Sequence, residues 1–182
     1  AGERNCQKML AESNKVRSIV FIGAECTGKT NIAQTIAKRL EEPCSNEYVR
    51  QYVDQLDRPL NQSDLEPIAR GQIRIEDEAY AKASKYAFHD TNLLSSILYA
   101  EHYFDTHIAW GDELFQSRNY NHYFFCQPDI PWKADPGQRE SPQEREKLHV
   151  QFESILTRFR IRYTTLEGSL EQRINAVLET CI

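Results

Sequence analysis

The segment Gly23-Ala-Glu-Cys-Thr-Gly28-Lys29-Thr30 has the pattern G-x-x-x-x-G-K-[ST]. It lies directly behind the apolar run 18–22 and in front of a helical pattern at 31–40, whose apolar residues recur on one face. The sequence therefore predicts a buried strand, a phosphate-binding loop and a helix, in that order. An ordinary glycine-containing turn between a strand and a helix is the alternative.

This loop supplies the groups that bind a nucleoside triphosphate. Its two glycines permit backbone angles that a side chain forbids, so successive amides can turn toward a phosphate chain at a helix N-terminus. We expect Lys29 to reach the β- and γ-phosphates and the Thr30 hydroxyl to hold Mg²⁺, which makes ATP and Mg²⁺ the predicted cofactors. The predicted nucleotide-binding residues of the loop are Gly23, Ala24, Glu25, Cys26, Thr27, Gly28, Lys29 and Thr30.

The composition is typical of a soluble, globular domain. The chain has 182 residues, of which 40% are hydrophobic and 27% charged, enough for one core. A net charge of −5 without a basic block argues against sequence-independent binding of nucleic acid. No apolar run approaches the roughly 20 residues of a membrane span. We therefore expect neither a nucleic-acid partner nor a membrane partner, and the oligomeric state stays open.

The cysteines and the first residues bear on location and domain boundaries. The five cysteines are scattered and odd in number, which favours the reducing cytoplasm over a disulfide framework or structural zinc. Residues 1–16 are interpreted as an N-terminal tail, either a tag remnant or a cut from a longer polypeptide, because the chain starts with Ala1-Gly2. Residues 17–182 then form the single domain.

Strand patterns alternate with helical patterns along the domain. Strands are expected at 18–22, 44–47, 85–89, 121–126 and 161–166. Helices are expected at 31–40 and 49–53, from a cap at 63 to about 82, at 93–104, and after the starts at 141 and 169. A capping box of Ser63 and Glu66 is predicted to open the helix that ends near 82, and Leu170 is expected on the inner side of the last helix. The alternation predicts an α/β P-loop NTPase fold with a parallel five-stranded sheet flanked by helices.

Two carboxylates are expected beside the phosphate-binding loop, because ligands of such sheets bind at the carboxyl ends of the strands. Glu47 and Asp90 end the second and third predicted strands, and either could take the proton of an acceptor hydroxyl. Asp90 could instead support Mg²⁺ through water, together with Thr30. A helix N-cap or a solvated loop acid is the structural alternative for each carboxylate.

Positive charge for the transition state is expected from the segment after Phe125. Prolines and a glycine deny residues 128–140 any regular element. Arg139 and Arg145 lie in and just after this segment and are candidate phosphate clamps, unless they are solvated surface residues. The predicted catalytic residues are Lys29, Glu47, Asp90 and Arg139.

Five elements of the sequence together resemble a known family. They are Gly23-x4-Gly28-Lys29-Thr30, Glu47-Tyr48-x-Arg50-x-Tyr52, Ala69-x-Gly71-Gln72, Asp90-Thr91-Asn92 and Pro131-Trp132-x-Ala134-Asp135-x-Gly137-x-Arg139. In this combination they resemble the kinase domain of NadR-type ribosylnicotinamide kinases and their P-loop relatives, over roughly residues 17–180.

The resemblance implies a nucleoside-monophosphate-kinase-like fold. It also implies a lid at about 128–145 that closes over ATP, and transfer of the γ-phosphoryl group to a nucleoside 5′-hydroxyl. The substrate-binding residues expected on this basis are Glu47, Tyr48, Arg50, Gln72, Asp90, Asn92, Trp132 and Asp135. The chain departs from the family pattern at Asn46, where members that use nicotinamide riboside carry a Trp suited to stacking on a cationic ring, and at the additional Pro136 of the lid.

Two other functions are compatible with the phosphate-binding loop. The first is an ATP-binding regulatory domain, in which nucleotide binding drives a conformational change with little or no acceptor-dependent transfer. The second is an oligomerising motor-type ATPase. That class needs a paired acid for water activation, and Asp90-Thr91-Asn92 offers a single acid.

Overall fold

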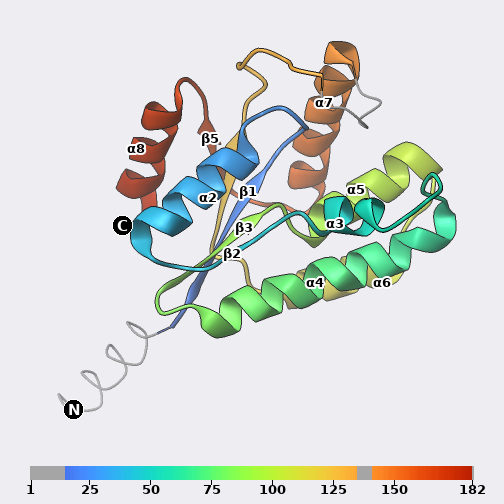
Figure 1. Ribbon diagram of the computed structural model, residues 1–182, viewed down its shortest axis with the longest axis horizontal. Helices are drawn as coiled ribbons and strands as arrows, with labels where there is room; N and C mark the ends of the chain where they lie inside the picture. Colours follow the sequence, from blue (N-terminus) through green and yellow to red (C-terminus); the bar gives the residue numbers. More distant parts are fainter. Residues whose placement is uncertain (1–14, 135–140, 182) are drawn as a thin grey trace.

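The computed structural model describes residues 15–134 and 141–181, which form a three-layer α/β domain (Figure 1). The strands are β1 (Arg17–Ile22), β2 (Cys44–Ser45), β3 (Tyr86–Asp90), β4 (His122–Cys126) and β5 (Tyr163–Leu166). They form one five-stranded sheet in the order β2-β3-β1-β4-β5, and every pair is parallel. The predicted parallel five-stranded sheet is confirmed.

Helices cover both faces of this sheet. The helices are α2 (Lys29–Leu40), α3 (Tyr48–Asp54), a 3-10 turn η1 (Gln62–Asp64), α4 (Leu65–Lys82), α5 (Leu93–Phe104), α6 (Ala109–Ser117), α7 (Pro142–Arg158) and α8 (Leu170–Cys181). Helices α2 and α8 pack on one face, and α4, α5, α6 and α7 pack on the other (Figure 1).

The two covered faces explain why the central strand is apolar throughout. Ile19 and Phe21 of β1 belong to the core on the side of α2 and α8, whereas Val20 and Ile22 belong to the opposite core. All four side chains are fully buried. In a strand that is buried on both sides, apolar residues need not alternate with polar ones. The continuous apolar run in the sequence has this pattern.

Several predicted local features differ in detail. The capping box consists of Asn61 and Asp64 rather than Ser63 and Glu66, because Asn61 accepts from the Ser63 amide while Asp64 accepts from the Asn61 amide. Glu66 instead pairs with Arg70 one turn further on.

Two helices also differ from expectation. Helix α6 was not predicted, although its Phe115 is buried in the core. Leu170 was expected on the inner side of α8 but is 37% exposed, because it lies in the first turn, ahead of the buried Ile174 and Val177.

The second strand is shorter than predicted. It ends at Ser45, and Glu47 is the N-cap residue of α3.

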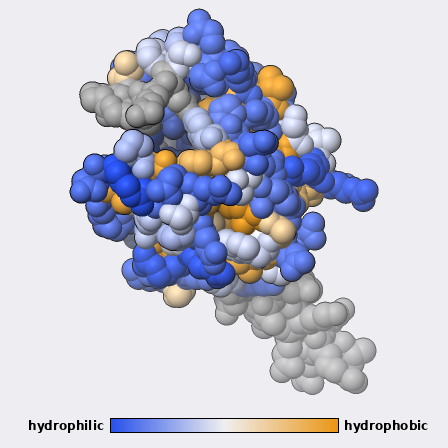
Figure 2. Space-filling view, turned by 90° about the vertical axis from the view of Figure 1, so that its right-hand side faces the viewer, coloured by the Kyte–Doolittle hydropathy of each residue, from blue (hydrophilic) through white to orange (hydrophobic). Residues whose placement is uncertain are grey.

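The surface agrees with the high charged fraction of the sequence. On the face shown in Figure 2, hydrophilic residues predominate and hydrophobic residues form small separate groups. No helix among the described residues is long and apolar enough to cross a membrane.

Candidate active site

The loop between β1 and α2 has the backbone conformation that a phosphate site requires. Gly23 has φ 145°, and a Cβ atom there would lie 2.8 Å from the carbonyl oxygen of Cys126. Gly28 has φ 84° and is the N-cap residue of α2. Both glycines are thus required by conformation, and the loop runs into the N-terminus of a helix packed on the sheet.

Lys29 lies inside the curve of this loop. Its Nζ atom donates a hydrogen bond of 2.7 Å to the carbonyl oxygen of Ala24, and the Thr27 hydroxyl donates to the same oxygen at 2.7 Å. Lys29 is buried, so its ammonium group acts in a region of reduced solvent screening. The arrangement places a positive charge where the loop amides would hold phosphates.

Arg173 of α8 stabilises the phosphate-binding loop by hydrogen bonding to its backbone. The sequence analysis did not identify this residue. Its guanidinium donates to the carbonyl oxygens of Thr27 at 2.6 Å and Gly168 at 3.1 Å, and it forms an ion pair with Asp129. The residue is buried. No local motif marks it, because its role depends on the packing of α8 against a loop 146 residues earlier in the chain.

Asp90 ends β3, which is the neighbour of β1 in the sheet, and it meets Thr30 across the loop. The Thr30 hydroxyl donates to Asp90 Oδ2 at 2.6 Å. Asp90 is 1% exposed, and its buried Oδ1 atom has no hydrogen-bond partner among the described residues. Burial raises the pKa of Asp90 above its ordinary value, although the positive charge of Lys29 opposes the shift.

These residues fit a magnesium ion. An unsatisfied buried carboxylate oxygen is costly unless a cation or water binds it, and a hydroxyl and a carboxylate are oxygen ligands that Mg²⁺ prefers. Within the described part of the chain, no group of three or more His, Cys, Asp or Glu residues could hold a metal ion by itself. Mg²⁺ would therefore take its remaining ligands from phosphate oxygens and water.

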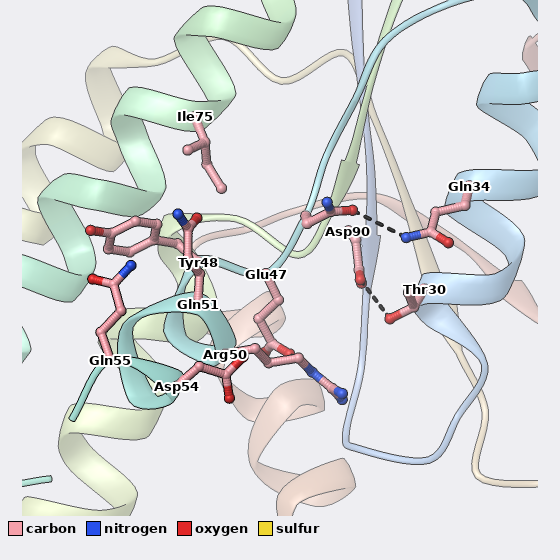
Figure 3. Close-up of a pocket in the computed structure, with 11 residues that line it drawn as sticks. Thr30, Gln34, Glu47, Tyr48, Arg50, Gln51, Asp54, Gln55, Ile75 and Asp90 are labelled. Carbon is pink, nitrogen blue, oxygen red and sulfur yellow. Dashed lines mark hydrogen bonds and ion pairs between the residues drawn. The ribbon is translucent and has the colours of Figure 1, made fainter. Parts of the chain in front are cut away.

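A cavity of about 470 Å³ opens beside Thr30 and Asp90 (Figure 3). It is lined by Thr30, Gln34, Asn46, Glu47, Tyr48, Arg50, Gln51, Asp54, Gln55, Ile75 and Asp90. These side chains come from α2, the segment before α3, α3 itself, α4 and β3. The cavity therefore brings both predicted carboxylates to one space at the carboxyl edge of the sheet.

Glu47 lies at the wall of this cavity and is 9% exposed. Its Oε2 atom accepts a hydrogen bond of 3.0 Å from Nε of Arg50, one turn along α3. This hydrogen bond raises the pKa of Arg50, even though partial burial acts in the opposite direction. The carboxylate is thereby oriented by a charged neighbour at the edge of the cavity.

Tyr48 owes its position to α4. A Cβ atom on Gly71 would overlap the Tyr48 ring, so the ring packs directly against the helix backbone. The Tyr48 amide donates to Gln72 Oε1 at 2.9 Å, and the Arg74 guanidinium lies 5.7 Å from the ring centroid. The Gly71-Gln72 pair in the sequence is explained by this contact.

Two predicted substrate-binding residues lie in the interior of the protein instead of lining the cavity. Gln72 is buried; its Oε1 atom accepts from the Tyr48 amide, and its Nε2 atom donates to Glu76. Asn92 is fully buried, caps α5 by accepting from the Leu94 amide, and donates to the Tyr123 hydroxyl at 2.9 Å. Both residues support the site from the interior.

The segment predicted to be a lid is described only in part. Asp135 and Arg139 lie outside the described residues, and Trp132 is half-buried but is not among the cavity-lining side chains. Arg145 lies in the first turn of α7, whose N-cap is Ser141 as expected. Its Nη1 atom donates to the carbonyl oxygens of Ile130 at 2.8 Å and Cys26 at 3.4 Å, so it joins the lid segment to the phosphate-binding loop.

Five cavity residues were missed by the sequence analysis. They are Gln34, Gln51, Asp54, Gln55 and Ile75. Helical spacing could have found some of them, because Gln34 follows Thr30 by one turn and Gln51 and Gln55 continue the face of Tyr48. Ile75 approaches from α4 and carries no such signal.

Comparison with known proteins gives a family and a fold. The family described as "AAA domain" matches residues 18–173. The trifunctional NAD biosynthesis/regulator protein NadR of Escherichia coli (strain K12) is 26% identical over 126 residues, which cover 66% of this chain and 30% of that protein. The chain therefore spans about a third of the length of this curated relative.

Solved structures share the architecture over most of the chain. NadR in complex with NR has a TM-score of 0.77 at 18% identity, covering 91% of this chain and 50% of that one. NadR in complex with NAD and AMP-PNP has a TM-score of 0.76 at 20% identity, covering 91% and 49%. Thymidylate kinase from Ehrlichia chaffeensis has a TM-score of 0.66 at 15% identity, covering 90% and 97%. These similarities confirm the nucleotide-kinase-like P-loop fold.

Proposed function

The chain belongs to the AAA domain family, and we propose that it is an ATP-dependent kinase that transfers the γ-phosphoryl group to a nucleoside 5′-hydroxyl, with ribosylnicotinamide or a similar nucleoside as acceptor. The NadR-type resemblance of the sequence and the similarity to NadR support this proposal. The chain spans 30% of the length of this NadR protein, so the acceptor is assigned here by proposal.

The observation that carries the proposal is the cavity next to the phosphate-binding loop. Its volume of about 470 Å³ lies within the range of roughly 300–1,000 Å³ for small-molecule sites. Thr30 and Asp90 form one wall, and Glu47 and Tyr48 form another. A domain that only hydrolysed or sensed ATP would not need such a cavity beside the predicted phosphate- and metal-binding residues.

In the proposed reaction, the acceptor hydroxyl oxygen forms a bond to the γ-phosphorus while the bond from that phosphorus to the β–γ bridging oxygen breaks, releasing ADP. The loop amides and Lys29 bind the phosphates. Thr30 and Asp90 would hold Mg²⁺, which would supply positive charge next to the transferring phosphoryl group. We propose that Glu47 accepts the proton of the acceptor hydroxyl, because Asp90 already accepts a hydrogen bond from Thr30 at the proposed metal site.

Water must be kept from the γ-phosphate, or ATP would be hydrolysed instead. We propose that residues 128–145 act as the lid. Arg145 already connects this segment to the phosphate-binding loop through Ile130 and Cys26. Arg139, Asp135 and Trp132 retain their predicted roles in phosphate and acceptor binding.

A nucleoside screen tests the function. Purified protein is incubated with ATP, Mg²⁺ and one nucleoside at a time, including nicotinamide riboside, and the products are measured by mass. We expect a nucleoside monophosphate and an equal amount of ADP, with neither formed by Lys29→Ala. Slow ATP hydrolysis that no nucleoside accelerates would favour the ATP-sensing domain and reject the kinase.

A further inference from the structure

Glu76 lies in the middle of α4, is 1% exposed and faces the interior of the protein. Its carboxylate accepts from Gln72 Nε2 at 3.2 Å, the Leu93 amide at 3.1 Å, Arg118 Nη2 at 3.2 Å and the Tyr120 hydroxyl at 2.5 Å. We propose that Glu76 is a positioning residue that holds the Tyr48 wall of the cavity and the turn after Asp90 in fixed relation to each other. The inference rests on the proposed function.

The first connection runs from Glu76 through Gln72 to Tyr48. An amide side chain can turn either its oxygen or its nitrogen toward a neighbour, and the neighbours decide which. Because Glu76 Oε1 is an acceptor, Gln72 directs Nε2 toward it and Oε1 toward the Tyr48 amide. Without the carboxylate, Gln72 loses the contact that fixes its orientation, and the first turn of α3 loses a defined acceptor.

The second connection runs from the same oxygen to the start of α5. Leu93 is the first residue of α5 and follows Asp90-Thr91-Asn92, the turn that carries the proposed metal-binding carboxylate. Thr91 has φ 67°, a conformation that non-glycine residues seldom adopt. An anion at a helix N-terminus is favourable, and here it also fixes a strained turn.

The other carboxylate oxygen is anchored away from the site. Arg118 follows the end of α6 and also pairs with Asp77, while Tyr120 precedes β4. All four groups that face the carboxylate donate hydrogen bonds, so they match its ionised form. Burial nevertheless raises the pKa of Glu76 to about 7. Burying an ionised carboxylate costs free energy, and an apolar side chain at this position would pack α4 against the core without that cost.

Glu76→Met removes both carboxylate oxygens and tests the inference, with Glu66→Met as the matched control on the exposed face of the same helix. For Glu76→Met we expect the acceptor KM to rise and kcat to fall, each about tenfold, while the KM for ATP changes less than twofold. We also expect amide hydrogen exchange of Tyr48 and Leu93 to accelerate at least tenfold. Glu66→Met should change none of these.

A purely structural role would give a different result. If Glu76→Met lowers the melting temperature but leaves the acceptor KM, kcat and both exchange rates unchanged below the transition, the inference is overturned. If the variant does not fold, Gln72→Met tests the Tyr48 connection alone. It should raise the acceptor KM and accelerate exchange of Tyr48 but not Leu93, and an unchanged Tyr48 exchange rate overturns the inference.

The exchange measurement separates this inference from the proposed function. If the wild-type protein shows no nucleoside-dependent turnover, the kinase proposal fails by itself. Exchange of the Tyr48 and Leu93 amides then still reports whether Glu76 holds the two segments. Unchanged protection in Glu76→Met would reject the coupling even where the kinase proposal succeeds.

Discussion

Two helices flank the cavity, and they are held in opposite ways. Helix α2 buries Lys29, Ile32, Ala33, Ile36 and Ala37 against the sheet, whereas α3 has no buried residue. Helix α3 is held by the Tyr48 contact with α4, and by a hydrogen bond of 2.9 Å from the Tyr52 hydroxyl to Asp64.

Segments with few buried apolar contacts open and move more readily than core elements. The nucleotide side of the site is therefore fixed by the core, and the acceptor side by a small number of polar and ring contacts. Substitutions on the α2 side should impair catalysis, whereas those on the α3 side, apart from the proposed proton acceptor Glu47, should mainly change acceptor affinity.

The largest expected effect is that of Lys29→Ala on the nucleotide side. Loss of the ammonium group from the loop removes charge stabilisation of the transferring phosphoryl group, and turnover should fall by about 10³-fold or more. Initial rates of ADP formation measure the effect. Lys38→Ala, on the exposed face of the same helix, should retain turnover within twofold. Residual turnover above one tenth in Lys29→Ala would remove the loop from the catalytic site.

A somewhat smaller loss of turnover is expected when either carboxylate is replaced. Asp90 lies on the nucleotide side of the cavity and Glu47 on the acceptor side. Glu47→Gln should lower kcat by about 10²-fold at any Mg²⁺ concentration, because it removes the proton acceptor. Asp90→Asn should lower kcat by a similar factor but also raise the Mg²⁺ concentration at half-maximal rate.

Titrations of the rate with Mg²⁺ distinguish these two variants. An unchanged kcat in Glu47→Gln would transfer the role of the base to Asp90. An unchanged Mg²⁺ requirement in Asp90→Asn would remove Asp90 from the metal site.

Gly71→Ala should act on the acceptor side alone. The new Cβ atom would overlap the Tyr48 ring, so the ring and the start of α3 must shift. We expect the acceptor KM to rise about tenfold and the free energy of unfolding to fall by about 1–3 kcal/mol, the usual cost of overpacking. Steady-state kinetics and urea unfolding provide the two values. A changed KM for ATP with an unchanged acceptor KM would contradict the assignment of the two sides.

The smallest expected effect is that of Asn46→Trp at the rim of the cavity. Asn46 is exposed and accepts a hydrogen bond of 3.2 Å from Gln34, so its replacement breaks one solvent-exposed contact. Stacking of an indole on a cationic ring contributes about 0.5–1 kcal/mol at an exposed site, so use of nicotinamide riboside should improve roughly two- to fivefold. The ratio kcat/KM for nicotinamide riboside is compared with that for a neutral nucleoside. No change in this ratio would mean that the acceptor base does not reach residue 46.

The local sequence was sufficient to predict the strand, loop and helix around Lys29. Each part depends on neighbouring residues, namely an apolar run, two glycines with special backbone angles and an apolar helix face. The parallel sheet followed from the alternation of strands and helices, and both carboxylates were found because each ends or closely follows a strand at the same edge. The capping box at Asn61 was misassigned because several polar residues there can cap a helix, and only the backbone path selects one.

Tertiary structure alone decided which distant groups complete the site. Arg173 contacts the phosphate-binding loop from α8, Ile75 lines the cavity from α4, and Glu76 lies in the interior. No pattern near these residues distinguishes them from surface or core residues. Gln72 and Asn92 were expected at the substrate but lie in the interior, because a motif specifies a residue and not the direction of its side chain. Hydrogen bonds between segments far apart in the chain depend on how whole helices pack, and such packing is set by the sum of many weak contacts.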